Sequence, residues 1–401
     1  GIESLAIPHN SNGSNGQMFK LVDWAGDPMG EKYVARRMRN EPLVEVTQIK
    51  GTSETHPLLS DNDEWAGFEI MDYRVATKLP SAPNGSYARQ ALRFGLELEA
   101  GGAGNPYKFG MIGSTDTHVG GGATREDKFF SKAGVMDGTP DRRGSVPANW
   151  FIGTLSRWLA PELVTEVDGN TYMKSSTFEY WGASGLAAVW AEQNTRESIY
   201  EAFRRKETFA TSGPRIKLRF FAGLDYPDTL AEDAMAVSKA YEGGVSMGGD
   251  LAGEAGASPG FLAWAVADPR SAPLQRLQVV KGWERNGKTF EKVFDVACSD
   301  GNAPAPGTFR CPDNGARVSA EDCSISRDVG AAELKVLWQD PEFEEDVEAF
   351  YYLRALENPS CRWSTWEALR AGVEPRSDLP RTIQERAWSS PIWYRAALIQ
   401  E

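Results

Sequence analysis

The sequence has few histidines, and its cysteines are confined to one part of the chain. Among 401 residues there are three histidines, and the four cysteines all lie in the last third, at Cys298, Cys311, Cys323 and Cys361. No cysteine pair has Cys-x-x-Cys spacing and no histidine is nearby, which disfavours zinc as the reason for these cysteines. Their even number and polar spacers predict two disulfides and an oxidising compartment, periplasmic or extracellular. Three connectivities remain open.

Long apolar runs and an excess of positive charge are also missing. No run approaches the ~20 residues of a membrane-spanning helix, so we expect no membrane span. The opening GIESLAIPHN lacks the basic start and sustained apolar core of a signal peptide and resembles the middle of a domain. The net charge of −13 argues against nucleic-acid binding, because phosphate backbones require basic surfaces. A small anionic substrate held by local cations remains compatible with this charge.

The chain changes character near residue 213. Up to that point, strand, loop and helix alternate, which predicts an α/β arrangement. The expected elements are helices over 31–39, over 86–99 with Ser86 as N-cap, and after the N-cap Thr195, together with a strand over 43–49. Alternation along that strand predicts one side with Val44, Val46 and Gln48 and another with Glu45, Thr47 and Ile49. We assign 1–212 to the α/β domain.

Beyond Pro214 the sequence consists of strand-length apolar runs separated by Gly, Pro, Asn and Asp. The runs are RIKLRFFAG, PGFLAWAVAD, LQRLQVVKGW, KTFEKVFDVAC, AELKVLWQD and AFYYLRALEN. This spacing is typical of an antiparallel sandwich. We therefore assign 213–401 to a β-rich, sandwich-like domain that contains both predicted disulfides.

The stretch GMIGSTDTHVGGG, residues 110–122, is the strongest candidate for a functional site. An apolar strand reaches Ser114, and Asp116 and His118 follow two residues apart. In an extended chain, residues i and i+2 point to the same side, so the carboxylate and imidazole are expected to converge at the end of the strand. A carboxylate oxygen and an imidazole nitrogen are suitable metal ligands.

The two other histidines occur in similar surroundings. His9 follows the apolar run at residues 5–7, and His56 follows the predicted strand and lies two residues after Glu54. Each one alone is more simply a surface or capping histidine, but the shared context favours a common site. Glu45 within the strand is either a buried ligand or base, or an ordinary edge-strand glutamate.

Several motifs resemble a known superfamily. GSTDTH resembles the Asp-x-His motif of the PHP (polymerase and histidinol phosphatase) superfamily of metal-dependent hydrolases. IPHNSNGSNG, EVTQIKGTSETHP, GLAAVWAEQNTRESIYEAFRRKETFATSGPRI, ENPSCRWSTWEALR and ERAWSSPIWY resemble a bacterial family of exported proteins of unknown function within it. The resemblance covers nearly the whole chain.

The resemblance implies a distorted (β/α)7, TIM-like barrel that binds two or three Zn, Mn or Fe ions and hydrolyses phosphoesters. It implies metal ligation by His9, His56, Asp116, His118 and Glu54. Of these, Asp116, His118 and His56 are the residues expected to act in catalysis. For substrate binding we name Asn10, Gly121 and Arg125, because the glycines before Arg125 form a potential anion-binding nest.

The sequence departs from this superfamily in one respect. It contains no His-x-His pair, which in the superfamily ends the first strand, and the α/β part is shorter than the ~250 residues of a complete barrel. We therefore expect a partial barrel, completed by a missing amino-terminal segment or by another chain docked against residues 1–120.

Two alternatives to a phosphoesterase remain. One is an amidohydrolase-like enzyme that cleaves C–N, carboxyl-ester or sulfate-ester bonds with the same metals, and the other is a non-catalytic binding protein with a residual metal site.

Overall fold

The structure is a computed structural model that describes residues 3–174 and 178–396. This part of the chain is mixed α/β and rich in strands, with 27% strand against 20% helix. Its α-helices are α1 (Glu31–Asn40), α2 (Ala88–Ala100), α3 (Pro140–Arg143), α4 (Trp150–Leu159), α5 (Arg196–Arg205), α6 (Ala236–Glu242) and α7 (Trp363–Ala371).

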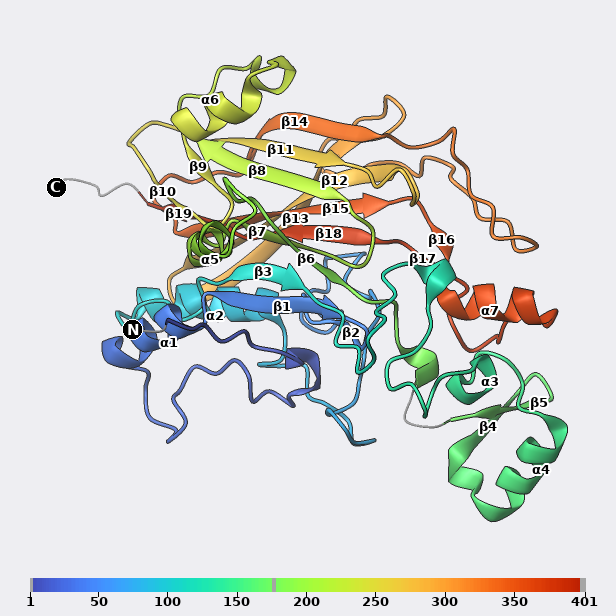
Figure 1. The fold of residues 1–401 in the computed structure, drawn as a ribbon. Helices are drawn as coiled ribbons and strands as arrows, with labels where there is room; N and C mark the ends of the chain where they lie inside the picture. Colours follow the sequence, from blue (N-terminus) through green and yellow to red (C-terminus); the bar gives the residue numbers. More distant parts are fainter. Residues whose placement is uncertain (1–2, 175–177, 397–401) are drawn as a thin grey trace.

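The strands of the described residues form three main sheets and two two-stranded sheets (Figure 1). A small sheet has the order β2–β1–β3, made of β2 (Gly51–Thr52), β1 (Leu43–Gln48) and β3 (Gly110–Gly113). A four-stranded sheet has the order β14–β11–β8–β9, made of β14 (Glu333–Gln339), β11 (Gly260–Val266), β8 (Lys217–Gly223) and β9 (Val245–Ser246). One two-stranded sheet is the hairpin of β4 (Val164–Val167) and β5 (Asn170–Met173). The other pairs β16 (Ser360–Cys361) with β17 (Thr382–Ile383), which the helix α7 separates in the chain.

The largest sheet has eight strands. Its main path is β10 (Asp250–Ala252), β19 (Ile392–Arg395), β15 (Ala349–Glu357), β18 (Arg386–Ser389), β7 (Thr208–Thr211) and β6 (Leu186–Val189). The long strand β12 (Leu274–Arg285) pairs with β15 and with β13 (Lys288–Cys298). The sheet therefore contains strands from both sides of the expected boundary between 212 and 213. Whether 1–212 and 213–401 are separate domains stays a prediction.

The expected barrel is wrong. In the described residues the strands form several small or open sheets and close no barrel. Although β1 and β3 pair in parallel, β6 and β7 pair antiparallel and join the large sheet through β18. A TIM-like barrel needs parallel strands that alternate with helices. The apolar pattern predicted the strands but carried no information about which sheet each strand would join.

Single elements were predicted better than their arrangement. The helices over 31–39 and after Thr195 are confirmed, and the Thr195 side chain accepts a hydrogen bond from Ser198 N at 3.2 Å. Ser86 does not cap α2, whose N-cap is Tyr87. The strand expected over 43–49 is present as β1, and both of its faces are buried. All six apolar runs after Pro214 contain a strand.

The small sheet packs closely on the large one. A Cβ added at Gly113 would lie 2.7 Å from the Leu186 carbonyl oxygen and 2.9 Å from that of Thr211, so only glycine allows β3 to approach β6 and β7 this closely. On its other side, Leu92 of α2 shares a core with Val44 of β1 and Val293 of β13. These contacts fix the carboxyl ends of β1 and β3 against the rest of the molecule.

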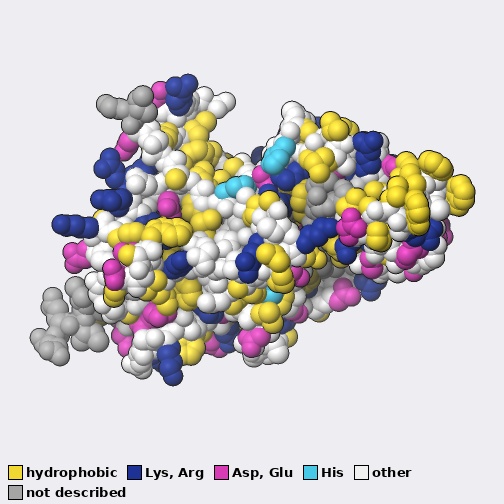
Figure 2. Space-filling view, turned by 90° about the horizontal axis from the view of Figure 1, so that it is seen from below, with side chains coloured by type: hydrophobic (Ala, Val, Ile, Leu, Met, Phe, Trp, Pro, Cys, Tyr) yellow, Lys and Arg dark blue, Asp and Glu magenta, His cyan; other side chains and the backbone are white. Residues whose placement is uncertain are grey.

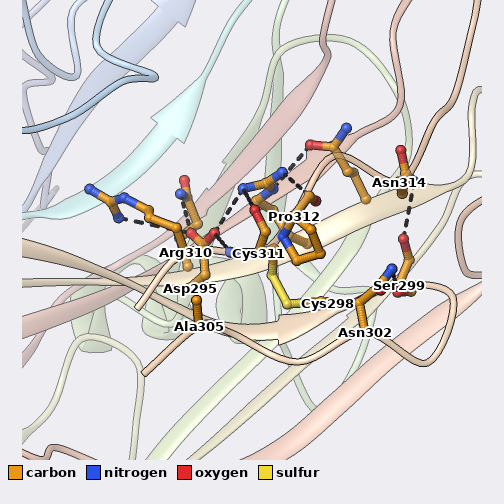
Figure 3. Close-up of a disulfide and its surroundings, with 12 residues drawn as sticks. Asp295, Cys298, Ser299, Asn302, Ala305, Arg310, Cys311, Pro312 and Asn314 are labelled. Atoms are coloured by element: carbon orange, nitrogen blue, oxygen red, sulfur yellow. Dashed lines mark hydrogen bonds and ion pairs between the residues drawn. A yellow bond between two sulfur atoms is a disulfide. The ribbon is translucent and has the colours of Figure 1, made fainter. Parts of the chain in front are cut away.

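Both predicted disulfides are present, and they join Cys298 to Cys311 and Cys323 to Cys361. Figure 3 shows the first pair beside Asp295, whose carboxylate accepts a hydrogen bond from Cys311 N at 2.6 Å. Two disulfides are compatible with an exported protein.

Buried carboxyl groups give the structure a dependence on pH. Burial raises the pKa of Glu357 to about 8, and one of its oxygens has no hydrogen-bond partner. The folded protein therefore keeps a proton that the unfolded chain releases near its ordinary pKa of 4.5. Folded stability is favoured below that pKa and declines as the pH rises through about 8.

We expect Glu357→Gln to raise the melting temperature by about 2 °C at about pH 8.5 and by less at about pH 5, because the amide needs no proton to remain neutral. Calorimetry across this range measures the difference. Glu333→Gln, which changes an exposed carboxylate on β14, is the matched control and should give a flat profile. An equal effect of Glu357→Gln at both pH values would contradict the prediction.

Candidate functional site

Asp116 and His118 do converge, but not through the extended chain that the sequence predicted. The strand β3 ends at Gly113, and Asp116 adopts a left-handed backbone conformation with φ of 47°. His118 Nε2 lies 3.5 Å from Asp116 Oδ1. Asp is one of the few residues that tolerates this conformation, because its short side chain bonds locally. The turn, rather than strand alternation, therefore brings the two side chains together.

His9 reaches the same carboxylate from a different segment. The Pro8 carbonyl oxygen accepts a hydrogen bond from Glu45 N of β1 at 3.1 Å, so the segment before His9 runs beside this strand. His9 Nδ1 donates to the Glu45 carboxylate at 2.9 Å, and His9 Nε2 lies 3.5 Å from Asp116 Oδ1. Glu45 thereby fixes the imidazole so that Nε2 faces the site. Ser114 also donates its hydroxyl to Glu45.

Two lysines complete the cluster. Lys50, which follows β1, forms an ion pair with Asp116 Oδ2, and Lys132 Nζ donates to the same oxygen at 2.7 Å. Lys132 Nζ is also 3.2 Å from His118 Nε2. The surface in Figure 2 shows histidine side chains beside acidic and basic ones at a hollow in the molecule. We call His9, Glu45, Lys50, Asp116, His118 and Lys132 the Asp116 cluster.

The positive charge of Lys132 lowers the pKa of two other basic groups in this cluster, Lys50 and His118. Burial, together with the neighbouring charge of Lys132, lowers the pKa of Lys50 to about 7. Burial also lowers the pKa of Lys132. The charge of Lys132 is the largest cause of the lowered pKa of His118. This shift favours the neutral form of the His118 imidazole, which has a lone pair for a metal or a proton.

His56 and Glu54 have partners outside this cluster. His56 Nδ1 accepts a hydrogen bond from Leu58 N at 3.1 Å, and its Nε2 lies 3.7 Å from Asp72. The buried Glu54 carboxylate forms ion pairs with Arg89 and Arg354. The structure therefore gives Glu54 a place in a buried ion-pair network.

The three residues predicted to bind substrate do not form a group. Asn10, which follows His9 in the chain, accepts a hydrogen bond at its Oδ1 from Gln48 Nε2 at 2.6 Å. Gly121 is exposed, with nothing within 4 Å of an added Cβ. Arg125 forms an ion pair with Asp127 at 2.8 Å and lines a separate cavity of about 470 Å³. Of these three residues, only Asn10 adjoins the Asp116 cluster, because it follows His9 in the chain.

The donor set of the cluster suits a divalent metal, although the present arrangement is not a metal site. Within residues 3–174 and 178–396, no group of three or more His, Cys, Asp or Glu side chains is arranged to hold a metal ion. The Asp116 carboxylate contacts two ammonium groups, which compete with a metal for its oxygens. Two imidazole nitrogens and one carboxylate oxygen are nevertheless common ligands of Zn and Fe. The hydrogen bond from His9 Nδ1 to Glu45 is the usual second interaction of a metal-ligating histidine.

Comparison with known proteins identifies the family. Residues 1–396 match DUF3604, which is described as a protein of unknown function. The chain belongs to this family. No curated protein and no solved structure matches it significantly. Membership of the wider PHP superfamily stays a prediction for this DUF3604 protein.

No local sequence pattern indicates the two lysines of this DUF3604 protein. Lys50 stands at a turn after β1, and Lys132 lies 14 residues after His118, with no pattern that connects them. For Glu45 the sequence left two alternatives open, and the edge-strand alternative is wrong, because β1 is the middle strand of its sheet and is buried on both faces.

We expect Glu54→Gln to lower the free energy of unfolding by about 3 kcal/mol, because it leaves buried arginines with less compensating charge. Metal content after dialysis against Zn or Mn should not change. Urea unfolding and elemental analysis measure these two effects. Glu41→Gln, which removes the partly exposed i,i+4 pair with Arg37, is the control and should cost about 0.5 kcal/mol or less. Loss of metal from Glu54→Gln without a loss of stability would make Glu54 a ligand instead.

Proposed function

We propose that this DUF3604 protein is a metal-dependent hydrolase of phosphoesters that acts at the Asp116 cluster. One observation carries the proposal: His9 Nε2 and His118 Nε2 each lie 3.5 Å from the same Asp116 oxygen. Residues from two separate segments thereby present metal-binding atoms at one point, beside the carboxyl ends of the parallel strands β1 and β3. Open α/β sheets commonly bind their ligands at this edge.

Each residue of the cluster has a role that follows from its contacts. Asp116, His9 and His118 would hold Zn, Mn or Fe, and Glu45 keeps His9 Nδ1 protonated so that Nε2 remains available. A divalent ion supplies activation of water near neutral pH and polarisation of the ester. The lowered pKa of His118 favours its neutral imidazole, whose Nε2 lone pair would bind the ion.

The two lysines favour an anionic substrate over a neutral one. Lys50 and Lys132 both direct their ammonium groups to the cluster, where they would contact the charged oxygens of a phosphate or sulfate group. A neutral carboxyl ester or amide offers no such charge. We therefore favour phosphoesters, with sulfate esters as the closest alternative. The two disulfides support a periplasmic or extracellular location for this activity.

We expect Asp116→Asn combined with His118→Ala to reduce bound Zn or Mn to background, because two of the three ligands are removed. Hydrolysis of nitrophenyl phosphate should fall with it, and nitrophenyl acetate should be a poor substrate for the unmodified protein. Elemental analysis after dialysis and a panel of nitrophenyl phosphate, sulfate and acetate measure both effects.

Two further variants separate the roles of the charges in this test. Lys50→Met should increase metal affinity, since it removes a cation that competes for Asp116, and it should weaken binding of the phosphate substrate. Asp225→Asn alters an exposed carboxylate outside the cluster and serves as the control. Equal metal content in the unmodified protein and the Asp116/His118 double variant would contradict the site. Bound metal without hydrolysis of any of the three esters would indicate a binding protein.

A further inference from the structure

The helix α4 shows the reverse of the usual amphipathic arrangement. Helices on protein surfaces normally turn their apolar face to the core. In α4 the buried residue is Gly153, and a Cβ added there would lie 3.3 Å from Thr171 Cβ of β5 and 3.6 Å from Ala148 Cβ. Arg157, the only charged residue of α4, forms an ion pair with Glu166 of β4 at 3.4 Å. The small and charged side of the helix is thus fixed against the β4–β5 hairpin.

The opposite side of α4 is apolar and exposed. At 3.6 residues per turn its large side chains fall within an arc of about 200°, in which Thr154 is the only polar residue. Trp150 and Trp158 are 79% and 81% exposed. We define the α4 face by its exposed apolar residues, which are Trp150, Phe151, Ile152, Leu155, Trp158 and Leu159.

The α4 face lies on a projecting part of the molecule. In Figure 1, α4 and the β4–β5 hairpin extend away from the sheets at one end of the structure. Figure 2 shows hydrophobic side chains gathered at that end. A flat surface can therefore reach α4 without contact with the rest of the protein.

We propose that the α4 face inserts into the interfacial layer of an electrically neutral lipid membrane. Every helix in the described ranges is too short or too polar to span a bilayer, so the interaction is with one surface of it. Trp and Phe are favoured at the membrane–water boundary, where an apolar helix face enters about 5–10 Å. The two tryptophans stand two turns apart, near either end of the helix.

Charge favours this occupant over a second copy of the chain. Two copies with a net charge of −13 each repel one another.

The width of the face favours lipid over a protein groove. Helices that bind in grooves use a narrow stripe of anchors at i, i+3, i+4 and i+7. Trp150, Phe151 and Ile152 are consecutive, so the exposed apolar arc is wider than such a stripe. The negative charge of the protein disfavours anionic lipids, and neutral phosphatidylcholine is therefore the surface to test.

The test is flotation of the purified protein with phosphatidylcholine vesicles. We expect the unmodified protein to float with the vesicles, in low salt and in high salt alike. Replacement of Trp150, Phe151 and Trp158 by Ser should lower the partition coefficient at least about tenfold, because three large apolar side chains no longer enter the lipid. Trp24→Ser, at a tryptophan that is 77% exposed outside α4, is the matched control and should float normally.

Three results would overturn the proposal. These are failure of the unmodified protein to float, equal flotation of the triple variant, and gel filtration that shows a dimer for the unmodified protein and a monomer for the triple variant. A dimer of this kind would mean that a second copy covers the α4 face. Brominated phosphatidylcholine gives a reading that does not depend on a variant, because it should quench part of the tryptophan fluorescence of the unmodified protein.

Discussion

A buried ion-pair network joins the amino-terminal part of the structure to the large sheet. Arg89 of α2 and Arg354 of β15 share the carboxylates of Glu54 and Asp63, and all four side chains are buried. Tyr352 donates its hydroxyl to Glu54. Burial alone would raise the pKa of Asp63, but the charges of Arg354 and Arg89 outweigh it and keep this pKa well below its ordinary value. The network is therefore charged throughout the physiological range.

The network engages Glu54 away from the candidate site. The loop after β2 that carries Glu54 is held by Arg89 N, which donates to the Glu54 carbonyl oxygen at 2.9 Å. Both ion-pair partners of the Glu54 carboxylate in these contacts, Arg89 and Arg354, lie outside the Asp116 cluster. The Asp116 cluster depends instead on β1 and β3, whose parallel pairing sets Glu45 beside Ile112 and brings the segments of His9 and Asp116 to one edge.

The sequence predicted individual elements and part of the site, but not the arrangement of the sheets. Local patterns are enough to recognise α1, α5 with its cap Thr195 and the strands after Pro214, because propensity and capping act within a few residues. Which strands pair is decided by long-range contacts, such as the close approach at Gly113 to β6 and β7. The expected barrel failed for this reason.

The same distinction explains which site residues were recognised. His9, Asp116 and His118 were noticed because histidine is rare here and Asp-x-His is a compact motif. Lys50 and Lys132 carry no local pattern and reach Asp116 only through the fold. The left-handed conformation of Asp116, which brings it to His118, is likewise a property of the folded loop.

With three histidines, nitrogen NMR of the imidazoles during a Zn titration tests most directly whether His9 and His118 share one site. The structure predicts that both ring signals shift together, with one dissociation constant, while the signal of His56 stays unchanged because that ring contacts Leu58 and Asp72 instead. Shifts of His9 and His118 at clearly different Zn concentrations, or a shift of His56 alone, would contradict the account.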